Sequence, residues 1–410
     1  MNHLPARAPS ARTLLALCGL GLGLGTVHAE TSPYYLGLSE SIVHDSNIYR
    51  LSDARGTPTD IKSRSDTSYA TALVGGIDQQ WGRQRLTGSL NLAYNKFQKN
   101  DQLNYHGNAI DLGWDWASVY NLSGNLNAST RRSLRRFDSA ETGVIAGQRN
   151  IEGTRQVGGV VRLGVVTPLT VEAAASHRAV GFSADSFRGS EYRQDMGSLG
   201  GRYRVSGSVA MGLGWRDTST KYTNDGSDSN RRDVDLTLQW LPSELTSLSA
   251  RISRTSTTYA HQSGNDFSGN TGELQGSTQA TGKLRLNARL SRDTGLSYSV
   301  FNVGDVSSAT QFNRITDSWR LSADYAASAK ISATASLAQD RRDLSKSLTS
   351  SFTLGGSDTT THSSLGLRWT PLRSLLIGTS IDLERRTVSG GVGLPYSSTA
   401  YTVYGQFTLQ

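Results

Sequence analysis

One pattern recurs along this chain and restricts the folds open to it. In its last copy a strand ends at Trp369, a tight turn follows around Pro371, and residues 375–384 alternate between apolar and polar side chains. Successive side chains of a strand face opposite sides, so such a segment has one apolar and one polar face. The pattern repeats after Trp240 and Val166, and after Trp116 without the proline. The repeating unit is a two-stranded hairpin, and a chain of such hairpins predicts a β-barrel.

The connections between the alternating segments follow a rule of their own. About 18 segments fit between residues 34 and 409, with 16 as the alternative even count that a single-chain bacterial barrel allows. Long polar connections fall at 44–65, 98–105, 137–150, 183–192, 219–231, 260–270, 297–312, 343–359 and 388–397. Short ones alternate with them, such as 117–120, 205–207, 281–283 and 326–330. Short periplasmic turns and long outer loops are typical of outer-membrane barrels. We therefore expect an all-β fold, a transmembrane antiparallel up-and-down β-barrel.

The first 29 residues have the features of a secretory signal peptide. Arg7 and Arg12 form a positive region, residues 14–24 are apolar, and cleavage is expected after Ala29. This predicts a signal peptide at 1–29 and an outer-membrane barrel at 30–410, in the cell outer membrane of a Gram-negative bacterium. The only cysteine, Cys18, lies in the signal peptide, which excludes disulfides and thiolate metal sites from the mature chain.

Charge and hydropathy agree with a membrane barrel. The formal net charge is +8, and removal of Arg7 and Arg12 leaves +6. The mean hydropathy of −0.40 suits a barrel because only alternate strand residues face lipid. The basic balance does not indicate a nucleic-acid partner, since none is expected in the outer membrane.

The apolar positions of the segments predict the lipid-facing surface. Leu112, Trp114 and Trp116 share one face, and the pattern recurs in later segments. Aromatic side chains fall at strand ends beside short turns, where they predict an interfacial girdle at headgroup depth. These aromatic residues are Trp116, Tyr203, Trp240, Tyr325 and Trp369.

The opposite face carries charges of both signs, which would each cost several kcal/mol in lipid and therefore predict a water-filled lumen. The expected basic lining, along the path of a substrate, is Arg131, Arg162, Arg178, Arg202, Arg216, Arg289, Arg342, Arg368 and Arg386. The expected acidic lining is Asp111, Asp115, Asp233, Asp235, Asp324, Asp382 and Glu384.

Arginines recur about ten residues after each short turn, at a similar membrane depth. The alternation places Arg131, Arg178, Arg216, Arg342 and Arg386 in a lumen ring, whereas Arg254 and Arg292 face outward. Two interpretations stay open. The inward arginines guide an anionic polymer through weak, repeated contacts. Alternatively, they pair with acids such as Asp340, Asp382 and Glu384, while outward arginines bind lipopolysaccharide phosphates.

The sequence predicts no catalytic or metal site. The histidines after residue 29 are scattered, with neither an HExxH pattern nor a G-x-S-x-G elbow. Residues 224–230 are rich in oxygen ligands but lack the spacing of a calcium loop, so a solvated loop is expected. We therefore expect a protein that is not an enzyme and that has no cofactor.

The N-terminal third resembles a known family. The matching segments are SPYYLG from Ser32, HDSNIYR from His44, SDT from Ser65, the pair Gly75-Gly76, GRQRL from Gly82 and YNKF from Tyr94. Over about residues 32–120 they resemble the EpsL-like putative β-barrel porins of exopolysaccharide biosynthesis operons. Beyond that region the resemblance is limited to the hairpin pattern and the arginine placement. The resemblance implies an outer-membrane protein of polysaccharide secretion and transfers no site residues.

From these observations the sequence leads us to expect a channel for export of a secreted exopolysaccharide through a basic polar lumen. The first alternative is an uptake porin for sugars or small anions, and the second is a non-conducting structural component of the secretion machinery. The expected partners are outer-membrane lipid and lipopolysaccharide, the secreted polysaccharide and periplasmic export components, without nucleic acid.

Overall fold

The computed structural model describes residues 32–53, 57, 61–137, 148–223, 228–261, 266–303, 306–344, 356–390 and 394–409, all within the unit Ser32–Gln410. The expected signal peptide, 1–29, lies outside the described residues. Within these ranges no helix is long and apolar enough to cross a membrane.

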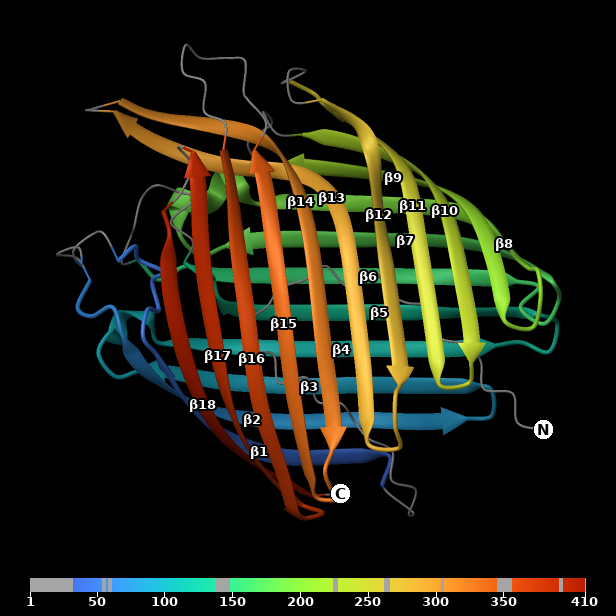
Figure 1. Ribbon diagram of the computed structural model, residues 1–410, viewed down its shortest axis with the longest axis horizontal. Coiled ribbons are helices and arrows are strands. Elements are labelled where there is room, and N and C mark those ends of the chain that lie inside the picture. Colours follow the sequence, from blue (N-terminus) through green and yellow to red (C-terminus); the bar gives the residue numbers. More distant parts are fainter. Residues whose placement is uncertain are drawn as a thin grey trace. The chain divides into compact units, whose positions relative to one another are not determined.

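Eighteen antiparallel strands make up one closed sheet. Each strand pairs with its neighbours in sequence, and β1 pairs with β18, so no edge is left open (Figure 1). The expected fold class and strand count are confirmed. The strands are β1 (Tyr34–Asp45), β2 (Asp66–Trp81), β3 (Gln84–Phe97), β4 (Tyr105–Ala117), β5 (Leu122–Leu134), β6 (Ile151–Leu163), β7 (Leu169–Phe182), β8 (Tyr192–Arg204), β9 (Val209–Tyr222), β10 (Ser229–Ser243), β11 (Thr246–Tyr259), β12 (Phe267–Gln279), β13 (Leu284–Val303), β14 (Val306–Ala326), β15 (Ile331–Leu344), β16 (Gly356–Leu372), β17 (Leu375–Gly390) and β18 (Tyr396–Leu409).

The two ends of the barrel differ in the length of their connections. Short turns such as 82–83, 118–121 and 373–374 join the strands at one end, while longer segments such as 46–65 and 135–150 join them at the other. The tight turns depend on left-handed backbone conformations. Gly164 has a φ of +85°, and a Cβ there would lie 2.4 Å from the Leu169 carbonyl oxygen. Glycine is therefore the residue that fits this turn.

Two predicted connections are shorter in the structure. The segment 297–312 was expected to be a long loop, but β13 and β14 run through it and pair from Leu284–Tyr325 to Val303–Val306. Similarly, β16 starts at Gly356, so the last part of the predicted loop 343–359 belongs to a strand. In β13 the alternation of Leu296, Tyr298 and Val300 with serine continues past the predicted end of the strand, whereas the start of β16 from Ser357 to Thr361 is polar and gives no such signal.

The outward face is apolar over most of the strand length. Leu213 is 64% exposed, and the directly paired Leu236 is 52% exposed. The aromatic residues Tyr203, Trp240, Tyr325 and Trp369 also lie outward and exposed at the ends of strands beside short turns. A wall of exposed apolar side chains is stable against lipid rather than water.

Two 3₁₀ helices lie in the longer connections, η1 (Asp101–Leu103) between β3 and β4 and η2 (Asp185–Ser190) between β7 and β8.

Candidate functional site

The inward face of the sheet carries the charged residues that the sequence assigned to the lumen. Register shows this directly: Arg216 pairs with Asp233 on the inward face, while the next positions, Trp215 and Val234, pair on the outward face and are exposed. By the same alternation, all sixteen residues expected in the lumen lie opposite the exposed apolar set of their strands. Their part in a solute path belongs to the function proposed below.

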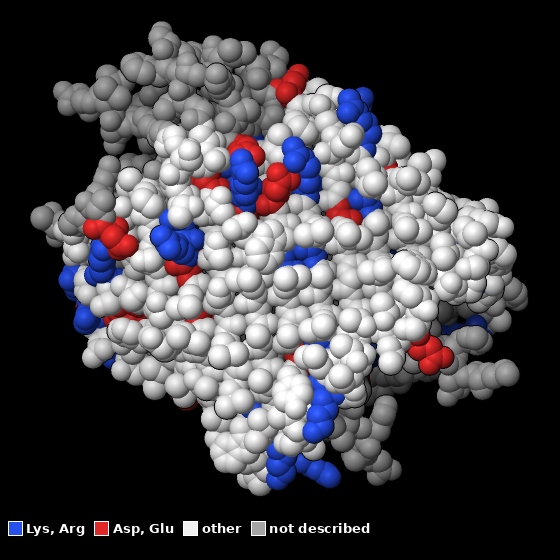
Figure 2. Space-filling view, viewed as in Figure 1, with Lys and Arg blue, Asp and Glu red and all other residues white. Residues whose placement is uncertain are grey.

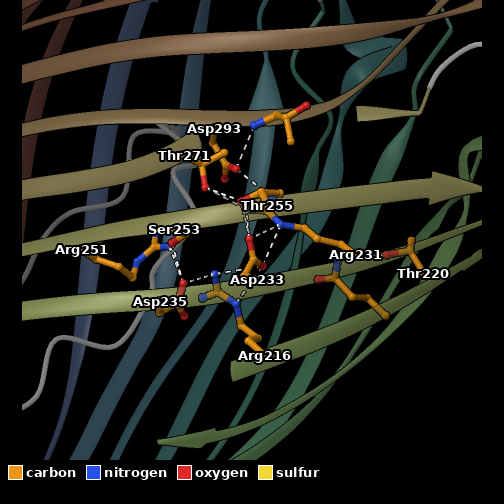
Figure 3. Close-up of polar contacts among 12 residues, drawn as sticks. Arg216, Thr220, Arg231, Asp233, Asp235, Arg251, Ser253, Thr255, Thr271 and Asp293 are labelled. Carbon is orange, nitrogen blue, oxygen red and sulfur yellow. Dashed lines mark hydrogen bonds and ion pairs between the residues drawn. The ribbon is translucent and has the colours of Figure 1, made fainter. Parts of the chain in front are cut away.

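The largest group of charges, the Asp233 network, lies on β9 to β13 (Figure 3). The Asp233 side chain is fully buried and accepts hydrogen bonds from Arg231 Nε at 2.9 Å and Arg216 Nε at 3.2 Å. The Thr255 hydroxyl donates to the same carboxylate at 2.5 Å. A buried carboxylate needs such partners because removing a charge from water carries a large desolvation cost.

Two further acids extend this network along the wall. Asp235 lies 3.5 Å from Arg216 and 3.7 Å from Arg251, and it accepts a hydrogen bond from the Ser253 hydroxyl. On the other side, Arg231 Nη1 reaches Asp293 of β13 at 2.8 Å. The network therefore joins five strands, β9 to β13, through charge-assisted hydrogen bonds, which stiffens this part of the lumen lining.

A second group, the Asp358 cluster, joins β15, β16 and β17. Asp358 accepts Arg342 Nε at 2.8 Å and Arg386 Nη2 at 2.9 Å. Arg386 is only 1% exposed, so its guanidinium is shielded from any solute in the lumen. Two of the five arginines expected to form an open ring thus converge on one buried carboxylate, and the single ring is not what the structure contains.

A third group, the Glu384 cluster, connects distant parts of the wall. Glu384 of β17 binds Arg50 Nε at 3.2 Å, forms an ion pair with Arg136, and accepts the Tyr396 hydroxyl at 2.5 Å. Arg136 follows β5, which is separated from β17 by β18, β1, β2, β3 and β4. Strands six positions apart in an 18-stranded barrel are roughly 30 Å apart across the lumen. The segment that carries Arg136 must therefore extend inward from the rim, whereas Arg50 follows β1, which only β18 separates from β17.

These inward segments have a small core of their own. Tyr49, Leu51, Ile61 and Leu103 are buried together, and the ring of Tyr49 lies 4.6 Å from that of Phe137. Buried Asp66 organises the same region by accepting the backbone N–H groups of residues 98, 99 and 100. These contacts hold the described residues of the β1–β2 connection, 46–53 and 61–65, against η1 and the end of β3.

Arg50 occupies this mouth in a strained conformation. Its φ is +55°, which an arginine seldom adopts. Its guanidinium bonds Asp45 at 2.8 Å as well as Glu384. Strain of this kind persists only where surrounding contacts stabilise it.

The other expected lining residues form local contacts or have no ion partner. Arg162 binds Glu172 at 2.7 Å, Arg289 binds Glu273 at 2.8 Å, and Arg202 reaches only Gln239, at 3.5 Å. Asp324 accepts Asn287, and Asp382 accepts Ser380. Among described residues, no ion pair joins Arg131, Arg178, Asp111 or Asp115 to an opposite charge. The inward Arg368 lies beside Gly378 in the register between β16 and β17.

The acids that the sequence predicted as partners of the inward arginines were partly wrong. Asp340 and Asp382 accept serine hydroxyls instead of arginines, whereas Glu384 does pair with Arg50 and Arg136. The acid that receives Arg342 and Arg386 is Asp358, which the sequence had placed in a loop. Outward, Arg254 contacts Asn270 and Ser268, and Arg292 pairs with Asp317, in the orientation the alternation predicts.

Several residues of these groups were not predicted from the sequence. Arg231 and Asp293 have the inward alternation of their strands, and that signal was available. Arg50, Arg136 and Tyr396 carried no signal, because their contacts join segments far apart in the sequence. In the described part of the chain, no group of three or more His, Cys, Asp or Glu is arranged to hold a metal ion.

Comparisons with known proteins are limited to the fold. No protein-family model and no curated protein matches the sequence. OccK2 (OpdF) of Pseudomonas aeruginosa is similar in structure with a TM-score of 0.48 at 12% identity, covering 92% of this chain and 98% of that one. OccAB4 of Acinetobacter baumannii has a TM-score of 0.47 at 10% identity, covering 93% and 99%. The outer membrane protein OpdK of Pseudomonas aeruginosa has 0.43 at 14%, covering 92% and 99%.

Because these TM-scores are below 0.5 and the identities are 14% or less, the assignment of a closed barrel rests on the strand pairing itself. The resemblance of residues 32–120 to the EpsL-like group finds no support in the matches.

Proposed function

We propose that this chain is an outer-membrane channel through which small anionic solutes pass passively into the cell. This is the uptake alternative from the sequence, and it now takes the place of polymer export as the main function. A barrel of 18 strands is wide enough to leave an aqueous path, and its outward face suits a bilayer. The expected signal peptide would direct the chain to that membrane.

The observation that carries the proposal is the Glu384 cluster. The segments after β1 and β5, which lie four strands apart, meet at one carboxylate of β17 and fill part of the mouth with the buried core around Tyr49. A mouth narrowed by ordered side chains and loops limits the size of the solute. It favours small molecules over a hydrated polymer chain.

The preference for anions is supported by a sector of the wall on β5 to β8. Arg131 and Arg178 lie on either side of β6, opposite Thr154 and Gln156, and neither pairs with a described carboxylate. Elsewhere most inward arginines are neutralised by aspartate or glutamate. A guanidinium group that no carboxylate neutralises offers weak, exchangeable binding to a carboxylate or phosphate, as passage through a pore requires.

Liposome swelling with solutes of graded size tests this function. The purified protein should admit small sugar acids and phosphates faster than neutral sugars of the same size, and it should exclude dextrans. Free passage of dextran would contradict the size limit, and an impermeable barrel would leave only the structural alternative.

Polysaccharide export remains the second candidate because of one observation. The segment from His44 to Arg50, which carries part of the family resemblance, supplies Tyr49 and Arg50 to the narrowed mouth. In an export channel this segment would have to move aside for the polymer. Deletion of the gene followed by measurement of secreted polysaccharide separates the two functions, since an uptake channel leaves secretion unchanged.

A further inference from the structure

The outward wall of β6 to β9 has a regular order of side chains from its outer end towards the short turns. The first row contains Arg155, Ala179, Arg193 and Lys221, each directly opposite the next. Going down the strands, the following rows are Val157, His177, Asp195 and Ser219; then Gly159, Ala175, Gly197 and Asp217; then Val161, Ala173, Leu199 and Trp215. Three cations thus lie above a surface that becomes small and apolar.

The first row has no internal counter-charge. Arg155, Arg193 and Lys221 are exposed, and none bonds to a described side chain. The nearby acids are already engaged: Asp195 binds His177 at 2.6 Å, and Glu191 accepts the N–H of Phe182. Arg193 and Lys221 are direct cross-strand neighbours, where like charges destabilise a sheet. An anion between them would remove that repulsion.

Three other outward arginines are paired with an acid of the wall. Arg232 pairs with Asp217 at 3.3 Å, Arg292 with Asp317 at 3.0 Å and Arg341 with Asp343 at 3.4 Å. On the face formed by β12 to β18, Figure 2 shows basic and acidic side chains next to one another above a mostly uncharged wall. Some outward arginines are therefore neutralised by acids of the same wall, whereas the cations of the β6–β9 row are not.

The depth of the row matches a headgroup layer. On β8, Arg193 is ten residues from Tyr203, the exposed aromatic beside the short turn. Ten residues span roughly 33 Å along a strand, or about 25 Å along the membrane normal at a tilt of about 40°. That is the height of the apolar band, so the cations lie at the outer interface when Tyr203 lies at the inner one.

We propose that Arg155, Arg193 and Lys221 bind a phosphate of lipopolysaccharide in the outer leaflet. The row is about 14 Å wide across three strand spacings, which allows two guanidinium groups and an ammonium to meet one phosphorylated sugar. Ala179 leaves room for the headgroup between the two arginines. The acyl chains descend over Ala175 and Gly197, whose small size leaves the wall open; a Cβ at Gly197 would meet nothing within 4 Å.

The test compares two triple variants with the same change of net charge. In R155Q/R193Q/K221Q the proposed site is removed, whereas R254Q/R292Q/R341Q removes three outward arginines that bond side chains of the wall. The full protein is purified in detergent, and its affinity for bisphosphoryl lipid A, dephosphorylated lipid A and phosphatidylglycerol is measured by native mass spectrometry.

We expect R155Q/R193Q/K221Q to bind bisphosphoryl lipid A on the order of a hundredfold more weakly than the unmodified protein. The control triple variant should retain its affinity, and the unmodified protein should bind the dephosphorylated lipid poorly. If the first triple variant does not fold, R193Q alone should weaken binding by about fivefold. Equal losses in both triple variants, or no loss in the first, would overturn the proposal. So would equally tight binding of phosphatidylglycerol, which would indicate a general anionic-lipid surface.

Discussion

At the scale of single residues, the lumen is organised around three carboxylates that each hold two guanidinium groups. Asp233 binds Arg216 and Arg231, Asp358 binds Arg342 and Arg386, and Glu384 binds Arg50 and Arg136. Each carboxylate joins residues from different strands or connections. Loss of a single negative charge therefore leaves two positive charges to repel each other, and the effect depends on which segments they belong to.

Glu384→Gln should open the mouth. A neutral amide does not neutralise Arg50 and Arg136, so the two segments should separate and the path should widen. Single-channel conductance in a planar bilayer should rise, and larger solutes should enter liposomes. Asp382→Asn is the matched control, because that acid lies on the same strand and accepts only Ser380 among described residues. An unchanged conductance in a folded Glu384→Gln barrel would show that the cluster does not narrow the path.

Asp233→Asn should lower stability rather than alter conduction. The carboxylate is fully buried, while the arginines that bind it are about one-fifth exposed and partly solvated. Breaking a buried ion group of this kind costs about 1–3 kcal/mol after allowance for water screening. The temperature at which the folded band converts to the unfolded band in SDS should fall. Asp324→Asn keeps an oxygen that can accept the hydrogen bond from Asn287, at 3.3 Å, and should change that temperature little.

Replacing Arg131 and Arg178 together by Gln should reduce anion preference. These residues supply positive charge that no described carboxylate neutralises, so the reversal potential in a salt gradient should shift towards cations. Arg342→Gln is the control, because Arg342 is already bound to Asp358 and contributes less to the field in the lumen. Equal shifts in the two variants would mean that the β5–β8 sector has no special role.

At the scale of strands and connections, the structure assigns each end of the barrel a different kind of linker. Ser186 lies in η2 of a longer connection, and Ser206 lies in a short turn. Both are exposed and outside the strands. If the long connections face the medium, Ser186 is accessible from outside the cell, whereas Ser206 is accessible only from the periplasm.

Labelling with a membrane-impermeant maleimide tests this orientation. The sequence has no cysteine after residue 18, so Ser186→Cys and Ser206→Cys each introduce a single thiol into the barrel. On intact cells Ser186→Cys should react and Ser206→Cys should not, whereas both should react after the outer membrane is permeabilised. The reverse result would place the short turns outside.

The strand count was predictable because alternation continues over nearly every strand. The ends of β13 and β14 were not, because the alternation breaks down between Phe301 and Phe312, although Leu296, Tyr298 and Val300 still alternate with serine. The start of β16 is polar from Ser357 to Thr361, which hid Asp358. The inward set of arginines could be predicted from the alternation of side chains along each strand, but their partners could not. Alternation tells which face of the sheet a side chain occupies. It gives no information about contacts such as Arg136 with Glu384 that join distant strands.

At the scale of the whole molecule, the pairing of β1 with β18 has a consequence for how the barrel is made. Leu36 lies opposite Leu409, so this last pairing joins the two ends of the described chain. Closing a loop of that length costs roughly 5 kcal/mol in chain entropy. Until it forms, the first and last strands present open edges that can recruit other chains. The sheet therefore cannot close until β18 has been synthesised, and up to that point the edge of β1 stays exposed to pairing with other chains.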